Sequence, residues 1–192
     1  MSYNGPNSPA AAANDTSLGE LTWGNPSWCY SSNDLYSYTS FAPDAYQVYT
    51  YSYYLKATNF GFTIPEDSVI KGIVANVERK QAVSNPIYGV SDYAVQLCKA
   101  GVLGGTNKAA GGWPSVDTIQ QYGSSTDLWG LSLTAEDVMN SGFGIGISAY
   151  FGGISSGSMD ASTIYAYVDH ITLTVYYTPH ISYQVIQIHD EI

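Results

Sequence analysis

The chain has 192 residues, a formal net charge of −10 and six basic residues, of which only Arg79 and Lys80 are adjacent. This balance excludes direct nucleic-acid binding, which requires clustered Lys and Arg, and it opposes adsorption to anionic membranes. Only 11% of the residues are charged, whereas there are 19 Gly and 18 Tyr, so we expect a neutral, tyrosine-rich surface suited to permanent assembly.

The length suits one well-filled domain, which we place at residues 21–178, with arms at both ends. Residues 1–20 are rich in Pro, Ala, Asn and Gly without periodicity, so they are predicted to be an arm that only a neighbouring subunit would order. This segment lacks the basic and apolar parts of a signal peptide. We therefore expect assembly in a cytoplasm, where Cys29 and Cys98 would be free, buried thiols.

Alternating apolar and polar residues predict three long strands in the first half of the domain, after a short strand at Trp23. These strands cover residues 45–62, 69–83 and 88–99. In the third strand, the alternation places Tyr93, Val95 and Leu97 on the inward face.

Residues 101–129 are the least regular part of the domain, because glycines and prolines interrupt every pattern there. A loop of this length usually covers or binds something. One helical turn is expected at residues 134–140, with Thr134 as its N-cap. A strand follows at residues 143–151, and its glycines leave room for something to lie against them.

The longest stretch that reads only as a β-strand is residues 161–178, which contains no Gly or Pro and suits the centre of a sheet. Its alternation places Tyr165, Tyr167 and Asp169 on the same side as the apolar run from Ile171 to Tyr177. About seven strands joined by Gly- and Pro-rich loops predict an all-β, antiparallel β-sandwich of jelly-roll type.

Residues 179–192 alternate again after Pro179, and two interpretations stay open. The segment is either a C-terminal arm that pairs with a neighbour or one more strand of the same domain. As an arm, it would make its interface through Tyr183, Val185, Ile186 and Ile188.

No catalytic constellation is found, so we expect a protein that is not an enzyme and has no cofactor. Residues 153–157 fit G-x-S-x-G, but this motif has meaning only where a strand turns into a helix on an α/β sheet. The three histidines and two cysteines have no partners at metal-binding spacing, so no metal site is predicted.

The four tryptophans are the remaining candidates for a binding site. Exposed rings beside carboxylates could form a sugar-binding platform made of Trp113, Trp129, Asp117 and Asp127, because the C–H faces of a sugar stack on aromatic rings. The alternative is that the tryptophans fill the core or subunit contacts, as large aromatic side chains commonly do.

Several motifs of the domain are distinctive in sequence although they carry no chemistry. They are Trp23-Gly24-Asn25-Pro26, residues 54–65, Ile70-Lys71-Gly72-Ile73, Val77-Glu78-Arg79, Trp113-Pro114, Tyr122-Gly123, residues 126–130 and Val168-Asp169-His170-Ile171. In this combination, over residues 20–178, the chain resembles small virion structural proteins of tailed bacteriophages.

The resemblance implies a component of the virion, assembled in the host cytoplasm. We expect a capsid decoration or cement subunit whose partners are copies of itself and other virion proteins, the major capsid protein among them, with no nucleic acid and no membrane. The alternative from a different class is a carbohydrate-binding module of a tail fibre or spike, with a glycan as its partner.

Overall fold

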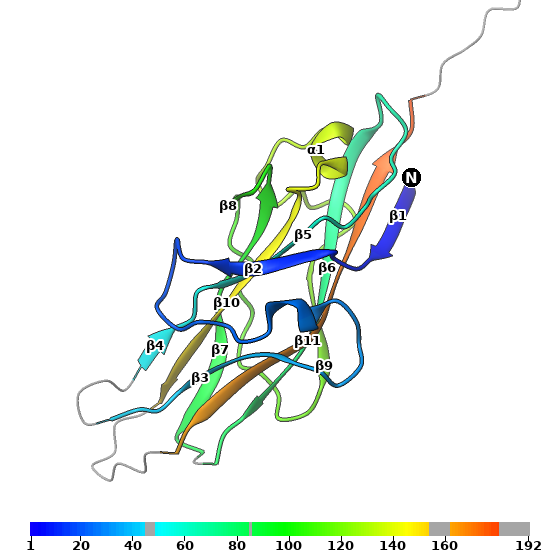
Figure 1. The fold of residues 1–192 in the computed structure, drawn as a ribbon. Helices are drawn as coiled ribbons and strands as arrows, with labels where there is room; N and C mark the ends of the chain where they lie inside the picture. Colours follow the sequence, from blue (N-terminus) through cyan, green and yellow to red (C-terminus); the bar gives the residue numbers. More distant parts are fainter. Residues whose placement is uncertain (45–48, 85, 154–161, 181–192) are drawn as a thin grey trace, which may run out of the picture.

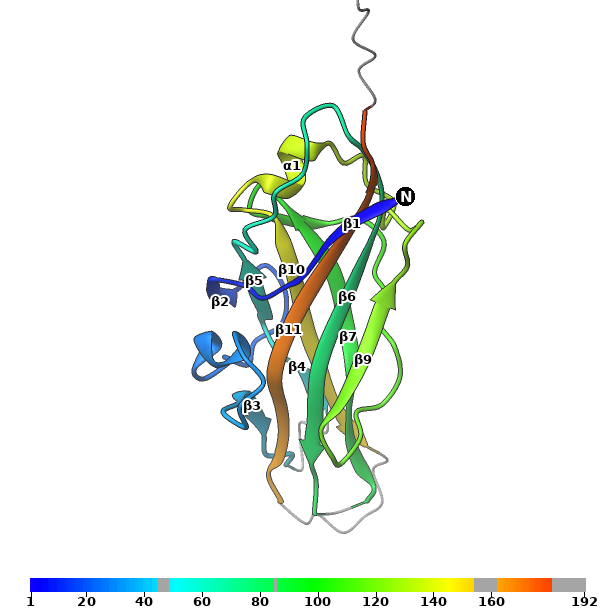
Figure 2. The ribbon, with the colours of Figure 1, turned by 90° about the vertical axis from the view of Figure 1, so that its right-hand side faces the viewer.

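Two antiparallel sheets pack face to face along the long axis of the molecule (Figures 1 and 2). The structure is a computed structural model that describes residues 1–44, 49–84, 86–153 and 162–180. Apart from one short helix and a 3-10 turn, the regular elements of this part of the chain are strands. The predicted all-β sandwich is therefore confirmed.

The first sheet, sheet A, has the order β1-β11-β6-β9, with β3 also paired to β11. Its strands are β1 (Ser2–Asn7), β3 (Ser37–Phe41), β6 (Val69–Ala82), β9 (Thr118–Gly123) and β11 (Ile164–Thr178). β1 pairs with one end of β11 and β3 with the other. β11 therefore lies inside the sheet, as its lack of Gly and Pro predicted.

The second sheet, sheet B, has the order β2-β5-β10-β7-β8, with β4 also paired to β10. Its strands are β2 (Ala11–Asp15), β4 (Tyr49–Tyr51), β5 (Tyr54–Thr58), β7 (Tyr88–Lys99), β8 (Val102–Gly104) and β10 (Gly144–Gly153). β4 and β5 follow the same side of β10 as two pieces of one interrupted strand.

With β4 and β5 counted as one strand, the facing orders are β3-β11-β6-β9 and β5-β10-β7-β8. This is the arrangement of a jelly roll, in which the chain passes back and forth between two sheets of four strands. The predicted jelly-roll topology is therefore confirmed, with β1 and β2 added to it at the N-terminus.

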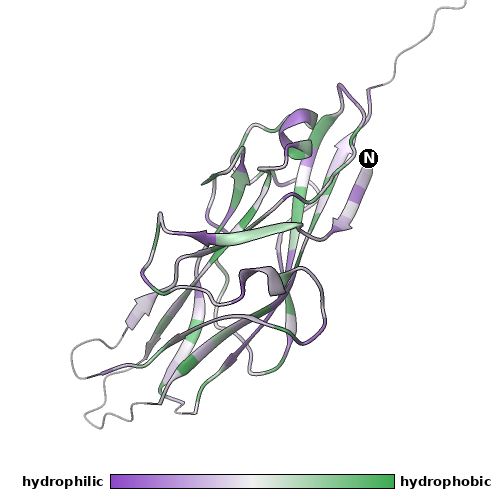
Figure 3. Cartoon of the chain, viewed as in Figure 1, coloured by the Kyte–Doolittle hydropathy of each residue, from purple (hydrophilic) through white to green (hydrophobic). Residues whose placement is uncertain are grey.

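The core lies between the sheets and is almost entirely aliphatic and aromatic. Fully buried side chains include Ile145, Ile147, Leu97 and Val95 from sheet B and Ile171, Leu173, Ile73 and Val77 from sheet A. Figure 3 shows hydrophobic and hydrophilic residues succeeding one another along the strands, as expected where one side faces a core and the other side faces water.

Two bulges correct the faces that strict alternation predicted. The register of β11 against β6 shifts between Val168 and His170, so Ile164, Ala166 and Val168 face the core together with Ile171. A second shift, opposite Ser148 and Ala149, leaves Tyr93 without a partner on β10. The prediction that Tyr93 points inward is therefore wrong, because a bulge changes the phase of every residue on one side of it.

The expectation that residues 1–20 need a neighbouring subunit for order is also wrong. β1 pairs with β11 of sheet A, and β2 pairs with β5 of sheet B. The side chain of Asn14 also receives a hydrogen bond from the backbone N–H of Trp23 at 2.8 Å and donates one to its carbonyl at 3.0 Å. This segment thus joins both sheets of its own chain.

The predicted strand at residues 45–62 is broken within the part that is described. The Ser52 hydroxyl accepts a hydrogen bond from the backbone N–H of Ala149. The backbone N–H of the next residue, Tyr53, bonds the carbonyl of Leu21 instead of β10. Positive φ angles at Asn59 and Gly61 then end β5.

The long irregular segment at 101–129 contains two strands that were not predicted, β8 and β9.

The structure confirms the helical turn predicted at residues 134–140 and the free, buried state predicted for Cys29 and Cys98. α1 (Ala135–Met139) begins with a capping box in which Thr134 and Asp137 bond each other's backbone N–H groups. Cys29 and Cys98 are both buried and unpaired, and burial raises the pKa of Cys29 to about 12. A thiol with so high a pKa is a poor nucleophile.

Candidate functional site

Four tyrosines gather on the outer face of sheet B, at the end of the molecule that carries β4 (Figure 1). We call Tyr49, Tyr51, Tyr93 and Tyr150 the tyrosine cluster. The rings of Tyr51 and Tyr93 have centroids 4.1 Å apart, and those of Tyr51 and Tyr150 are 5.7 Å apart. Tyr49 is 53% exposed and Tyr93 is 39% exposed. The cluster is therefore open to solvent although its rings touch.

Strand register and a bulge bring these four rings together. Tyr51 of β4 stands directly opposite Tyr150 of β10, and Tyr49 stands opposite Gly152. The bulge in β7 turns Tyr93 to the outside, where it packs on Tyr51. The ring of Tyr150 lies over Gly152, where any side chain would collide with it. The small residue thus lets the rings lie flat against the sheet.

The tyrosine cluster is an uncharged surface with polar edges. None of its four hydroxyl groups has a hydrogen-bond partner among the described residues. Partial desolvation, with the neighbouring phenols, raises the pKa of Tyr51, so its hydroxyl stays protonated at neutral pH. Such rings offer stacking faces and free hydroxyls at the same time, a combination common in protein and sugar recognition.

The sugar platform predicted on Trp113 and Trp129 is not what the structure contains. Both indoles are buried, with 2% and 0% of their surface exposed, so neither presents a ring face to a ligand. Trp129 donates its indole N–H to the Ile73 carbonyl at 3.0 Å. The alternative that these tryptophans fill the core describes them correctly.

The two carboxylates of the predicted platform are each paired with a lysine, and Asp127 also accepts a hydrogen bond from the Trp129 backbone N–H at 2.8 Å. Asp117 contacts Lys80 at 2.9 Å, and Asp127 contacts Lys108 at 2.7 Å. The structure therefore does not bring the four predicted residues together in one exposed site.

The indole of Trp113 belongs to a polar network that crosses the interior between the sheets. Asp92 of β7 accepts hydrogen bonds from the Trp113 indole at 2.8 Å, the Tyr122 hydroxyl at 2.9 Å and the Ala110 backbone N–H at 2.8 Å. The guanidinium of Arg79, on β6, lies 3.6 Å from the same carboxylate and 4.9 Å from the Trp113 ring. This network joins the two sheets and is closed to solvent.

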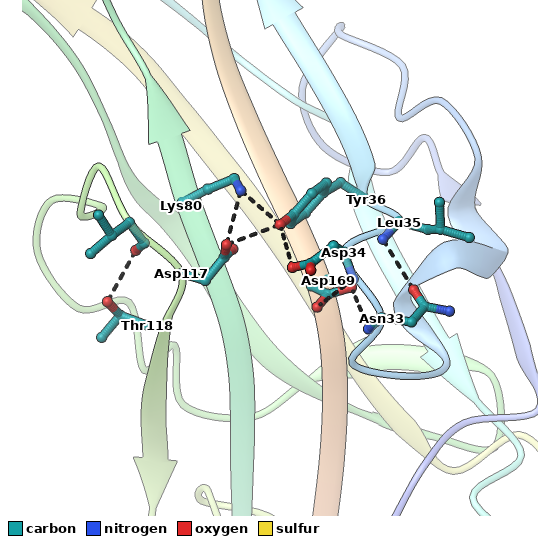
Figure 4. Close-up of polar contacts among 9 residues, drawn as sticks. Asn33, Asp34, Leu35, Tyr36, Lys80, Asp117, Thr118 and Asp169 are labelled. Carbon is teal, nitrogen blue, oxygen red and sulfur yellow. Dashed lines mark hydrogen bonds and ion pairs between the residues drawn. The ribbon is translucent and has the colours of Figure 1, made fainter.

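A second polar cluster lies beside β11 and contains the most connected lysine of the domain (Figure 4). Lys80 donates to the Tyr36 hydroxyl at 2.7 Å and to Asp117 at 2.9 Å, and its ammonium lies 3.9 Å from the Tyr36 ring centroid. The loop before β3 is fixed nearby, because the backbone N–H groups of Asn33 and Asp34 bond the buried Asp169.

This cluster has the wrong protonation states for base or nucleophile chemistry. Desolvation, together with the nearby carboxylates, raises the pKa of Tyr36 to about 12. Burial opposes the charge of Lys80, but its hydrogen bonds to Tyr36 and Asp117 prevail and raise its pKa. At neutral pH the phenol keeps its proton and the amine stays charged, so the cluster fastens the loop to the sheet.

No protein-family model matches this chain, and no curated protein matches it. The assignment of a function therefore depends on the geometry of the described residues. Within residues 1–44, 49–84, 86–153 and 162–180, no group of three potential metal ligands is found. The helix in this part of the chain is too short and too polar to cross a membrane.

Some predicted residues lie outside the described part of the chain. These are Tyr183, Val185, Ile186 and Ile188 of the proposed C-terminal interface, and residues 154–157 of the G-x-S-x-G match. Asp169 and His170 are described. Asp169 is buried under the loop at residues 33–34, while Nε2 of His170 lies 2.8 Å from the Ser8 hydroxyl.

The tyrosine cluster is the site that the sequence reasoning missed. A signal for it was present in the sequence, since tyrosines recur at every second or third position from Tyr46 to Tyr53. The contribution of Tyr93 depends on a bulge that alternation does not reveal.

Proposed function

We propose that this chain is a non-enzymatic structural protein of a bacteriophage particle, a capsid decoration or cement subunit that binds neighbouring virion proteins. The observation that carries the proposal is the tyrosine cluster, a group of exposed aromatic rings on the outer face of a rigid sheet. Tyrosine is enriched where proteins bind each other, because it buries a large area and orders only a short side chain.

Three further points support a structural role. The sandwich is a single block whose sheets share a continuous apolar core, so it can present a surface without deforming. The resemblance of residues 20–178 to small virion proteins of tailed bacteriophages gives the setting. The net charge of −10 would keep free subunits apart until each one meets its site.

Residues 179–192 supply a second proposed contact, through the alternating segment that contains Tyr183, Val185, Ile186 and Ile188. The pairing of β11 with β6 ends at Thr178 and Val69, at the end of the sandwich opposite to β4 (Figure 1). Removing residues 180–192 should leave a folded domain that assembles poorly. An unfolded product would contradict the proposal that this segment is an arm.

Sizing by native mass spectrometry tests the structural role directly. The purified chain is measured alone and mixed with particles of its phage that were assembled without it. We expect saturable binding at a copy number that matches the symmetry of the shell. A discrete oligomer that ignores the shell would contradict the decoration role.

A pair of substitutions connects this assay to the tyrosine cluster. Tyr93→Ser removes an exposed ring from the cluster and should weaken binding to the particle by about tenfold or more, the loss typical of a central contact residue. Tyr3→Ser removes a ring that is 64% exposed on β1 of the other sheet, and it should leave binding unchanged. Equal losses in both variants would contradict a role for the cluster.

The alternative function is a carbohydrate-binding module of a tail fibre or spike, and the same cluster favours it over the buried tryptophans. Its rings expose faces on which a sugar could stack and hydroxyls that could bond it. A glycan array discriminates between the two functions. Binding that is lost in Tyr93→Ser would support the module, and the absence of binding would support the decoration role.

A further inference from the structure

Within the described residues, β9 forms an outer edge of sheet A and pairs with β6 alone. Figure 2 shows it on the far side of β6 from β11. Its six residues stay in register with β6 without a bulge, and they include no proline and no charged residue. Natural sheets usually protect an edge with a charge, a proline or a bulge, because an unprotected edge can pair with another chain. β9 thus has the features of a strand that accepts a further strand.

The hydrogen bonds of β6 show which residues of β9 face this open edge. The backbone N–H of Ile73 bonds the carbonyl of Asp127, and that of Gln81 bonds the carbonyl of Pro114. These acceptors lie shortly after and shortly before β9, so the odd-numbered residues of β6 direct their backbone groups toward β9. The register pairs them with the even-numbered residues of β9. The odd-numbered residues of β9 therefore direct their backbone groups away from β6.

Ile119 and Gln121 are the odd-numbered residues in the middle of β9. Their backbone N–H groups donate to no group in the described part of the chain. The carbonyl of Gln121 accepts a hydrogen bond from the side chain of the preceding residue, Gln120, at 3.0 Å. Gln121 is exposed, and Ile119 is 63% exposed. The edge therefore offers donors, acceptors and an apolar side chain to an incoming strand.

Two other edges of the sandwich are covered by the chain itself. Gly24 and Tyr38 exchange two backbone hydrogen bonds, at 2.7 and 3.2 Å, beside β3. The backbone N–H of Lys108 bonds the carbonyl of Val95 beside β7 at 2.8 Å. β9 has no such cover among the described residues.

The segment at residues 181–188 has the properties of a strand that fits this edge. It lies outside the described residues, and its eight residues include no charge, no glycine and no proline. It is long enough to cover all of β9, because both strands extend by about 3.3 Å per residue. In a chain with a net charge of −10, two uncharged strands can also pair without the repulsion that acts elsewhere between copies.

We propose that residues 181–188 of one copy add to β9 of a neighbouring copy as a further strand of its sheet A. This inference rests on the proposed role of residues 179–192 as an arm, and it names the surface that the arm binds. The backbone of the arm bonds the outward groups of Ile119 and Gln121, and its apolar side chains cover Ile119. Because the arm of one copy occupies the edge of the next, the contact is head-to-tail and links copies into a ring or a row.

Native mass spectrometry of two variants and their mixture tests the proposal. Gln121→Pro removes an outward N–H and leaves the hydrogen bonds to β6 in place, so it closes the edge. The double variant Val185→Pro, Ile186→Pro, here called the arm variant, prevents the arm from pairing. Each variant alone should self-associate with a dissociation constant about tenfold or more above that of the unchanged chain. Their equimolar mixture should form 1:1 dimers, because one partner keeps its arm and the other keeps its edge.

The control Gln121→Thr changes the same side chain but keeps the N–H, and it should self-associate like the unchanged chain. Equal losses in Gln121→Thr and Gln121→Pro would overturn the proposal. An unchanged chain that stays monomeric, or a mixture without dimers, would also overturn it. If the arm variant still associated while Gln121→Pro did not, β9 would be pairing with itself and the arm would be excluded as its partner.

Hydrogen exchange gives a second test that leaves the sandwich unmutated. At a concentration where the unchanged chain is associated, the amides of Ile119 and Gln121 should exchange about tenfold or more slowly than in the arm variant. The amides of Gln120 and Tyr122 face β6, so they should exchange equally in both proteins. Equal exchange at all four amides would overturn the proposal.

Binding to the particle, measured separately, distinguishes this inference from the proposed function. A chain that binds particles without pairing its arm with β9 would overturn the inference and leave the decoration role standing. A chain that pairs its arm with β9 but ignores the particle would support the inference and contradict the decoration role.

Discussion

The substitution Asp92→Ala should destabilise the domain far more than Arg79→Met, although the two residues form one ion pair. Asp92 is the acceptor for three hydrogen bonds, each at 2.8–2.9 Å. Arg79 approaches the same carboxylate at 3.6 Å only, and its buried Nε and Nη1 atoms have no partner among the described residues. The carboxylate is thus the centre of the network, and the guanidinium is at its edge.

The contacts give the expected size of each effect. Asp92→Ala leaves an indole, a phenol, a backbone N–H and a guanidinium without their acceptor, so about 4–5 kcal/mol of unfolding free energy should be lost, as for a broken buried pair. Arg79→Met leaves the carboxylate with its three donors and removes two buried nitrogen atoms that lack partners. We therefore expect a loss of only about 1–2 kcal/mol.

Urea unfolding followed by circular dichroism measures both values. Lys80→Met is the matched control, because Lys80 is adjacent on β6 and its pair with Asp117 is partly exposed. That variant should cost at most about 1 kcal/mol. If Arg79→Met proved as costly as Asp92→Ala, the assignment of Asp92 as the centre of the network would be refuted.

The pH dependence gives a second test of the same network. Burial raises the pKa of Asp92, even though Arg79 and the hydrogen-bond donors oppose this shift. A carboxyl group whose pKa is raised on folding stabilises the native state at low pH and loses that contribution as the pH rises. Because Arg79→Met removes the opposing charge, the pKa of Asp92 should rise further, and this variant should recover stability relative to the unchanged chain as the pH falls from neutral toward the ordinary pKa of an aspartate.

Three further predictions concern the frame of the domain. Thr134→Ala removes the N-cap of α1 and should lower the unfolding free energy by about 1 kcal/mol, measurable in urea; an unchanged midpoint would contradict the capping role. Gly144→Ala places a methyl group against the backbone of β5 and should cost about 1–3 kcal/mol, whereas Gly104→Ala, which meets open space, should cost no more than about 1 kcal/mol by the same measurement. Lys56 holds the pKa of Asp15 at about 2. The pair therefore stabilises the domain above the ordinary pKa of an aspartate, and this contribution is lost as the pH falls toward 2. In acid unfolding, Asp15→Asn should start from a lower stability than the unchanged chain, and its stability should depend less on pH over that range.

Much of the sandwich could be predicted, because its long strands bury one face and leave the other partly exposed. β6 and β7 begin and end within one residue of the predicted ranges, since turn-forming residues such as Pro65, Pro86 and Gly101 lie just outside these strands. The bulges at Asp169 and Tyr93 could not be found, because a bulge changes the phase of the pattern without requiring a particular residue.

The candidate site was harder to predict than the fold, because exposure depends on contacts between distant segments. Trp113 and Trp129 occur in a stretch rich in Gly and polar residues, which favours exposure. Their indole N–H groups nevertheless find buried acceptors on β7 and β6. β9 was not predicted for a related reason, since it is an edge strand with mostly polar residues and pairs only with β6.

The position of β11 determines when the domain can fold during synthesis. β11 separates β1 and β3 from β6 in sheet A, so the first strand to leave the ribosome has its partner in the last strand described. Until residues 164–178 emerge, sheet A consists of separate pieces, and the apolar face of sheet B has nothing to cover it. Such long-range pairing places folding in the range of about milliseconds to seconds and exposes aggregation-prone surface meanwhile. Sheet A is therefore completed only once residues 164–178 have emerged, and added chaperones, which shield the uncovered face of sheet B until then, should increase the soluble yield.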